Sequence, residues 1–137
     1  MKKALFIVGC LLTSFISTAQ ENVSLTVSID NVQSNEGKVM VSLHTADTFM
    51  KGPGIQNVES VIENGKVTFT IENVAPGNYA IMALHDANEN RRMDFDAAGM
   101  PQEHYGMSNN PMSYGPPTFE SAKFEVTNTD MDLEIRF

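Results

Sequence analysis

Hydrophobic and polar residues alternate along most of this chain with a period of two, which is typical of β-strands that bury one face. The clearest run, residues 23–30, places Val and Ile or Leu at every odd position and Ser, Thr or Asp between them. Similar alternation or composition recurs along the rest of the chain. The pattern predicts seven strands, at residues 23–30, 38–45, 58–63, 66–72, 78–85, 119–126 and 131–137.

The turn signals between these stretches determine the expected fold class. Asn64-Gly65 is the strongest two-residue hairpin signal in the chain, and no stretch has helical periodicity. Short strands with one wet face favour an all-β protein, a single antiparallel β-sandwich of the prealbumin or immunoglobulin type. One long connection, residues 86–118, follows the fifth strand. Its Tyr, Phe and Met content predicts that it is ordered.

The amino-terminal 19 residues read as a signal peptide. Lys2 and Lys3 precede an apolar run, and Ser17-Thr18-Ala19 ends in the small residue that signal peptidase requires. The sequence therefore predicts export, to the periplasm or outside the cell, and a single domain at residues 20–137. Cys10 lies inside the apolar run, and we interpret it as part of that run rather than as a lipid attachment site.

The net charge of the chain restricts the classes of molecule that are expected to bind it. Removal of residues 1–19 takes away two lysines, which leaves 7 basic and 17 acidic residues and a net charge of 7 − 17 = −10. Nucleic acids and anionic membranes attract clustered Lys and Arg, so neither is expected to bind. No later segment is apolar enough to span a membrane. We expect a monomer that binds an extracellular or periplasmic ligand.

The acidic stretch after the fifth predicted strand has the spacing of a calcium loop. Oxygen-bearing side chains occupy positions 1, 3, 5, 9 and 11, and position 7 offers a backbone carbonyl; these residues are Asp86, Asn88, Asn90, Asp94, Asp96 and, at position 7, Arg92. Calcium takes six to eight such oxygens. Arg91 replaces the usual glycine and Ala97 the usual bidentate glutamate, so a weak calcium site is predicted. The alternative is a solvated turn, in which Asp and Asn bond their own backbone.

Two stretches resemble known families. Residues 69–79 (FTIENVAPGNY) resemble the turn of prealbumin-like modules such as carboxypeptidase regulatory domains. Residues 79–119, with H-D-x-N-x-N-x-x-x-D, then G-M-P-x-E-x-Y-G and S-N-N, then G-P-P-T-F, resemble the bacterial exported family called domain of unknown function 2141. That resemblance implies export and a β-sandwich, and it implies no activity. Family members tend to carry glycine where this chain has Glu89 and Arg91, and an aromatic residue in place of Met107.

Other combinations of residues give weaker hypotheses. Methionines and histidines near the long connection have the chemistry of a copper(I) site, but no M-x-x-M or M-x-H repeat is present, and we favour the packing of an irregular loop. A polar and aromatic ligand surface is expected at Glu103, Tyr105, Asn109, Asn110 and Tyr114.

The sequence thus favours an exported, non-enzymatic binding or structural module with a calcium loop and no organic cofactor. The alternatives are a carbohydrate- or peptide-binding module without metal, and a hydrolase that uses His85, Asp86 or Glu103.

Overall fold

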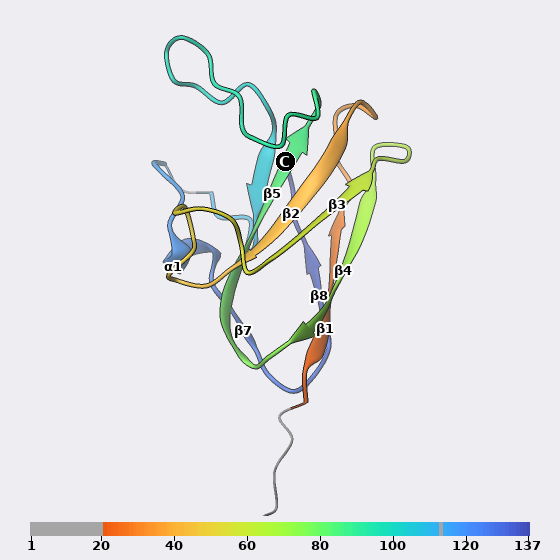
Figure 1. The fold of residues 1–137 in the computed structure, drawn as a ribbon, viewed down its shortest axis with the longest axis vertical. Helices are drawn as coiled ribbons and strands as arrows, with labels where there is room; N and C mark the ends of the chain where they lie inside the picture. Colours follow the sequence, from red (N-terminus) through yellow and green to blue (C-terminus); the bar gives the residue numbers. More distant parts are fainter. Residues whose placement is uncertain (1–20, 113) are drawn as a thin grey trace, which may run out of the picture.

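The computed structural model describes residues 21–112 and 114–137, so the predicted signal peptide and Cys10 lie outside the described residues. The fold is almost entirely β-structure, which confirms the predicted fold class (Figure 1). Its elements, in chain order, are β1 (Val23–Ile29), β2 (Lys38–His44), β3 (Gln56–Val61), β4 (Val67–Val74), β5 (Gly77–Asp86), β6 (Tyr105–Met107), α1 (Phe119–Ala122), β7 (Phe124–Val126) and β8 (Met131–Glu134).

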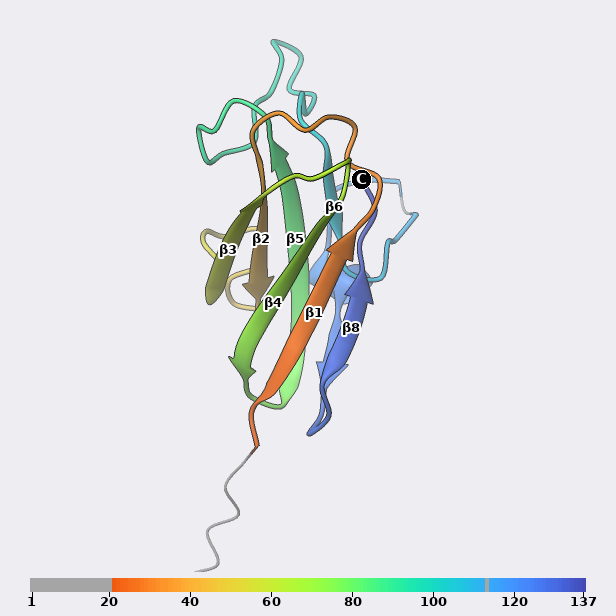
Figure 2. The ribbon, with the colours of Figure 1, turned by 90° about the vertical axis from the view of Figure 1, so that its right-hand side faces the viewer.

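Two sheets face each other as layers of a sandwich (Figure 2). The first has the strand order β4-β1-β8, and the second has the order β3-β2-β5-β6. Strand β5 is the longest, with ten residues, and β7 also pairs with it. The long connection leaves the end of β5 and projects beyond the sandwich (Figure 1).

The core lies between the two sheets and follows the alternation of the sequence. Strand β1 buries every odd residue, and β2 does the same with Val39, Val41 and Leu43, none of which is accessible to solvent. These side chains belong to one hydrophobic cluster that both sheets share. Branched aliphatic side chains suit this position because they pack well against a pleated surface.

Two predicted turns are confirmed. Asn64 and Gly65 both have positive φ, 52° and 71°, and the flanking Glu63 and Lys66 exchange two backbone hydrogen bonds of 3.0 Å. In the prealbumin-like turn, the Tyr79 hydroxyl donates a hydrogen bond of 2.7 Å to the carbonyl of Ala75. That bond ties the start of β5 to the first residue of the turn that precedes it.

Three details differ from the sequence prediction. There are eight strands among the described residues, because the short strand β6 lies within the long connection. The stretch predicted as one strand at 119–126 begins with α1, since the Thr118 hydroxyl accepts the Ser121 N–H and caps a helical turn. Strand β8 runs parallel to β1. The chain reaches β8 by crossing from the other sheet, so no tight hairpin forces an antiparallel direction.

The outer face of the larger sheet is covered over only half of its length. Residues 45–54 and α1 cover the half near the start of β5, where a second, smaller apolar cluster forms. That cluster comprises Phe49, Ala80, Met107 and Ala122, with Met82 and Phe119 packed against it. The other half lies beneath the projecting connection, and this arrangement positions the site.

Candidate functional site

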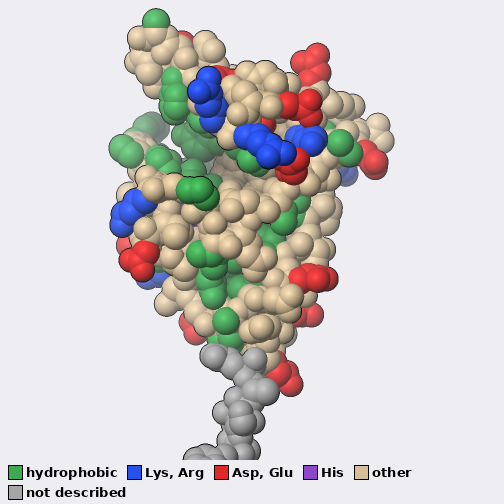
Figure 3. All heavy atoms as spheres, viewed as in Figure 1, with side chains coloured by type: hydrophobic (Ala, Val, Ile, Leu, Met, Phe, Trp, Pro, Cys, Tyr) green, Lys and Arg blue, Asp and Glu red, His purple; other side chains and the backbone are tan. Residues whose placement is uncertain are grey.

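A groove of about 370 Å³ opens on this outer face, between the sheet and the connection that projects above it. Figure 3 shows a hollow with hydrophobic side chains below the projecting connection. Strands β2 and β5 form the floor, and residues 91–101 form the roof. The residues that line the groove are Met40, Ser42, Met50, Met82, Ala83, Leu84, Arg91, Met93, Phe95, Pro101, Tyr105 and Pro117.

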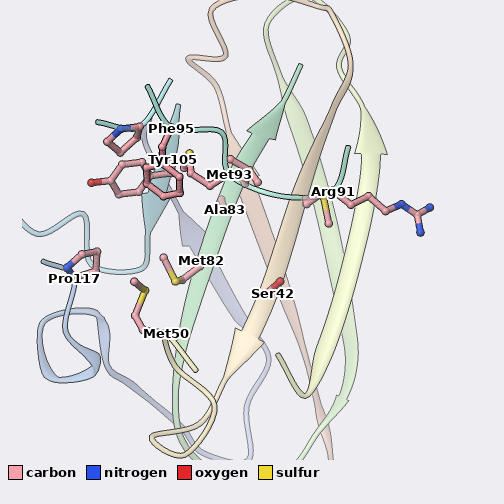
Figure 4. Close-up of a pocket in the computed structure, with 12 residues that line it drawn as sticks. Ser42, Met50, Met82, Ala83, Arg91, Met93, Phe95, Tyr105 and Pro117 are labelled. Atoms are coloured by element: carbon pink, nitrogen blue, oxygen red, sulfur yellow. The ribbon is translucent and has the colours of Figure 1, made fainter. Parts of the chain in front are cut away.

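The lining is apolar and rich in methionine. Four of these twelve residues are Met, and two are aromatic (Figure 4). The Ser42 hydroxyl donates a hydrogen bond of 2.8 Å to the Asn57 side chain, which leaves it little capacity to bind a ligand. Arg91 is the single charged residue of the lining. Ligand pockets of about 300–1,000 Å³ typically have such an apolar wall with few polar groups.

Two carboxylates determine the path of the roof. Asp86, which is only 2% exposed, accepts the backbone N–H groups of Asn90 (3.1 Å) and Arg91 (2.8 Å). Glu103 accepts the N–H groups of Ala87 and Asp94, both at 3.2 Å. A carboxylate that accepts backbone N–H groups forms strong hydrogen bonds because it is charged. These two side chains therefore hold the connection above the sheet.

The predicted calcium ligands are only partly brought together. The Asn88 and Asn90 side-chain amides both contact the carboxylate of Asp94, at 2.6 Å and 2.9 Å. Asp96 instead belongs to a separate turn, where its carboxylate accepts the N–H groups of Ala98 and Met100. The remaining candidate, Arg92, donates its backbone N–H to the Asn90 side chain, and its guanidinium lies 4.0 Å from Asp94.

Within residues 21–112 and 114–137, no three His, Cys, Asp or Glu side chains are grouped so that they could hold a metal ion. The predicted loop also relies on the side chains of Asn88 and Asn90 and on the backbone carbonyl of Arg92. The calcium site therefore stays a prediction.

The predicted polar ligand surface divides into two kinds of residue. The Asn109 side chain donates to the carbonyls of Ser121 and Lys123, and Asn110 bonds the backbone of Glu134 and Arg136. Like the side chain of Glu103, these two amides form hydrogen bonds to backbone groups of the same chain, and their role is structural. Tyr105 and Tyr114 remain exposed, and Tyr105 lines the groove.

The hydrolase candidates also form hydrogen bonds to the backbone. Nε2 of His85 lies 2.8 Å from the carbonyl of Glu36, and its ring stacks on Phe137. Asp86 and Glu103 hold the roof as described above. Each of the three side chains thus has a structural partner.

Sequence reasoning missed Met40 and interpreted Met82 only as a copper ligand or as loop packing; both lie on the floor of the groove. The sequence did contain a sign of this role, because both methionines occupy outward positions of strands whose inward positions are already apolar. An apolar residue at an outward position indicates that something covers or contacts that face.

A group of charges lies beside the groove. Glu59 on β3 accepts from Lys38 at 2.9 Å and from Arg91 at 3.4 Å. The hydrogen bond between Lys38 and Glu59 raises the pKa of Lys38 and lowers that of Glu59, so both groups stay charged. Figure 3 shows Lys and Arg side chains with Asp and Glu among them on the right of the hollow.

Comparison with known proteins identifies the family of the chain. No curated protein and no solved structure matches it. A family model described as "Uncharacterized protein conserved in bacteria (DUF2141)" matches residues 27–134. In the described part of the chain, no helix is long and apolar enough to cross a membrane. Because the matched residues run from within β1 to the end of β8 and cover most of the chain, the chain belongs to the DUF2141 family.

Proposed function

We propose that this protein is a non-enzymatic binding module that takes a small apolar ligand into the groove on the outer face of its larger sheet. The observation that carries the proposal is the groove itself, about 370 Å³ in volume and lined almost entirely by methionine, aromatic and aliphatic side chains. Exposed apolar surface of this kind is unfavourable in water unless a ligand covers it.

The methionines support a ligand of this class. The Met side chain has three rotatable bonds and a polarisable sulfur, so it adapts to apolar surfaces of different shape. Met82 and Met50 lie on one side of the groove in Figure 4, and Met93 approaches from the roof. This lining favours an apolar ligand over the carbohydrate that the sequence suggested, because a sugar needs several convergent hydrogen-bonding groups.

We propose that the protein binds this ligand after export from the cytoplasm. Residues 1–19 have the composition of a signal peptide, and the amino-terminal sequence of the protein recovered from its host would test this. Cleavage before Gln20 is the expected result. An uncleaved protein that stays in the cytoplasm would contradict this part of the proposal.

The binding test uses a neutral dye that fluoresces in apolar surroundings, N-phenyl-1-naphthylamine. Ser42→Phe places a ring on the floor of the groove, and we expect it to weaken dye binding at least about tenfold because it fills the site. Thr70→Phe is the matched control, since Thr70 is an exposed residue of β4 on the other sheet. Failure of the original protein to bind the dye, or equal binding by both variants, would refute the proposal.

A further inference from the structure

Methionine is concentrated in the groove. Residues 21–137 contain eight methionines, and four of them belong to the twelve residues of the lining. We call these four the groove methionines; they are Met40, Met50, Met82 and Met93. They come from β2, from residues 45–54, from β5 and from the roof, so the fold brings together side chains that are distant in the sequence.

The groove methionines are accessible to small oxidants. Met50 is 58% exposed, and the other three are half-buried beneath an open roof. Residues 21–137 contain no cysteine, so methionine supplies the oxidisable sulfur of this part of the chain. A hydroperoxide transfers one oxygen atom to such a sulfur. The S–O bond forms as the O–O bond breaks, the peroxide leaves as water or an alcohol, and the thioether becomes a sulfoxide.

The groove has few donors for a sulfoxide oxygen. This oxygen accepts hydrogen bonds, so it needs a donor when a ligand covers it. The Ser42 hydroxyl already donates to Asn57, and the Arg91 guanidinium extends away from the lining toward Glu59. Figure 4 shows the hydroxyl of Tyr105 pointing away from the methionines as well. An apolar ligand over an oxidised methionine would therefore bury a polar atom without a partner.

We infer that the groove methionines form a modification site, and that their oxidation to sulfoxides by a hydroperoxide releases the apolar ligand. This inference rests on the proposed function, since it assigns a regulation to the same groove. Methionine sulfoxide is reduced by two enzymes, one for each epimer at sulfur, so the change is reversible. Ligand binding then depends on the level of oxidant around the protein.

The test treats the protein with hydrogen peroxide, removes the peroxide, maps sulfoxides by peptide mass spectrometry and titrates the product with N-phenyl-1-naphthylamine. We expect sulfoxides at the groove methionines and dye binding weakened at least about tenfold, because a covered sulfoxide oxygen lacks a donor. Reduction with both sulfoxide reductases should restore binding. Saturation with dye before treatment should slow oxidation of the groove methionines but not of Met100, which is 62% exposed and does not line the groove.

Two variants with leucine in place of methionine assign the effect to the groove, since this exchange keeps side-chain volume and apolar character. The groove variant carries Met40→Leu, Met50→Leu, Met82→Leu and Met93→Leu. The control variant carries Met100→Leu and Met112→Leu, at exposed residues outside this groove. The groove variant should bind dye equally before and after peroxide, whereas the control variant should lose binding as the original protein does. If the groove variant does not fold, Met50→Leu with Met82→Leu replaces it and should retain more binding than the control.

The outcomes separate this inference from the proposed function. An untreated protein that binds no dye would refute the proposed function itself. Dye binding that survives sulfoxide formation at the groove methionines, or equal losses in the groove variant and the original protein, would overturn only the role of oxidation. The same holds if the groove methionines stay unoxidised while Met100 and Met112 are converted, or if circular dichroism shows that the oxidised protein has lost its β-structure.

Discussion

The two faces of the larger sheet differ although the same strands form both. The inward residues of β2 are Val39, Val41 and Leu43, which are wholly buried against the opposite sheet. The outward residues between them are Met40 and Ser42, which are half-buried and line the groove. One face is a packed interior, and the other is a partly covered surface.

The difference shows how one strand can stabilise the fold and bind a ligand. Stiff, branched side chains pack densely in one arrangement, whereas methionine adapts to several. Successive residues point to opposite faces, so the two sets can vary independently as long as the register is kept. In this sheet the inward set fixes the sandwich and leaves the outward set available for recognition.

The largest expected effect contrasts the same substitution on the two faces. Leu43→Ala opens a cavity in the dry interior and should lower the free energy of unfolding by about 2–5 kcal/mol. Leu84→Ala removes a half-buried side chain from the floor of the groove, and we expect less than about 1.5 kcal/mol. Urea unfolding of both variants measures the difference. Equal losses would contradict the distinction between the faces.

A smaller effect concerns pH and the covered half of the outer face. His44 is 4% exposed and packs edge-on against Phe49; burial lowers its pKa, although a hydrogen bond with Thr48 opposes the shift. Below the ordinary histidine pKa of about 6.5, the unfolded chain therefore binds a proton that the folded protein does not. The free energy of unfolding should fall as the pH drops through this range, by at most about 1.4 kcal/mol per pH unit for one group.

Chemical unfolding at a series of pH values between 5 and 8 measures this effect. His44→Gln should flatten the dependence, whereas His104→Gln, at an exposed histidine, should leave it unchanged. A dependence that persists in His44→Gln would assign it to other groups.

The smallest effect concerns the roof of the groove. We expect the predicted loop, which lacks a bidentate glutamate, to bind calcium only in the millimolar range, so several millimolar calcium should add no more than about 1 kcal/mol to the free energy of unfolding. Thermal unfolding in EDTA and in calcium, with magnesium as the control, measures the gain. A calcium-specific rise in Tm that Asp94→Asn abolishes would confirm the predicted site. A flat curve would leave the roof as a set of hydrogen-bonded turns.

Alternation was sufficient to predict most of the sandwich, because burial on one face follows directly from a period of two. The strand β6 escaped prediction because it has three residues and depends on pairing with β5. Gly106 within it marks a close approach, since a Cβ there would lie 2.3 Å from the carbonyl oxygen of Arg136. Such an approach comes from a distant part of the chain and leaves no local pattern.

The candidate site was harder to predict than the fold. The spacing of Asp and Asn predicted a calcium loop. Spacing cannot show whether a carboxylate faces a cation or a backbone N–H, and Asp86 faces two N–H groups. The groove depends on which half of the outer face residues 45–54 and α1 leave uncovered. That is a property of the assembled sandwich.

The pairing of β1 with β8 has a consequence for how the protein is made. Ser24 bonds Asp130, and Asn31 bonds Phe137, across 106 positions of sequence. The sheet that contains β1 therefore cannot be completed until residues 131–137 have left the ribosome. During synthesis β1 can pair with β4 but lacks β8 on its other side. Contacts of such long range in sequence form slowly. A nascent chain of this kind stays open until residues 131–137 have been made, and in that state it is accessible to chaperones.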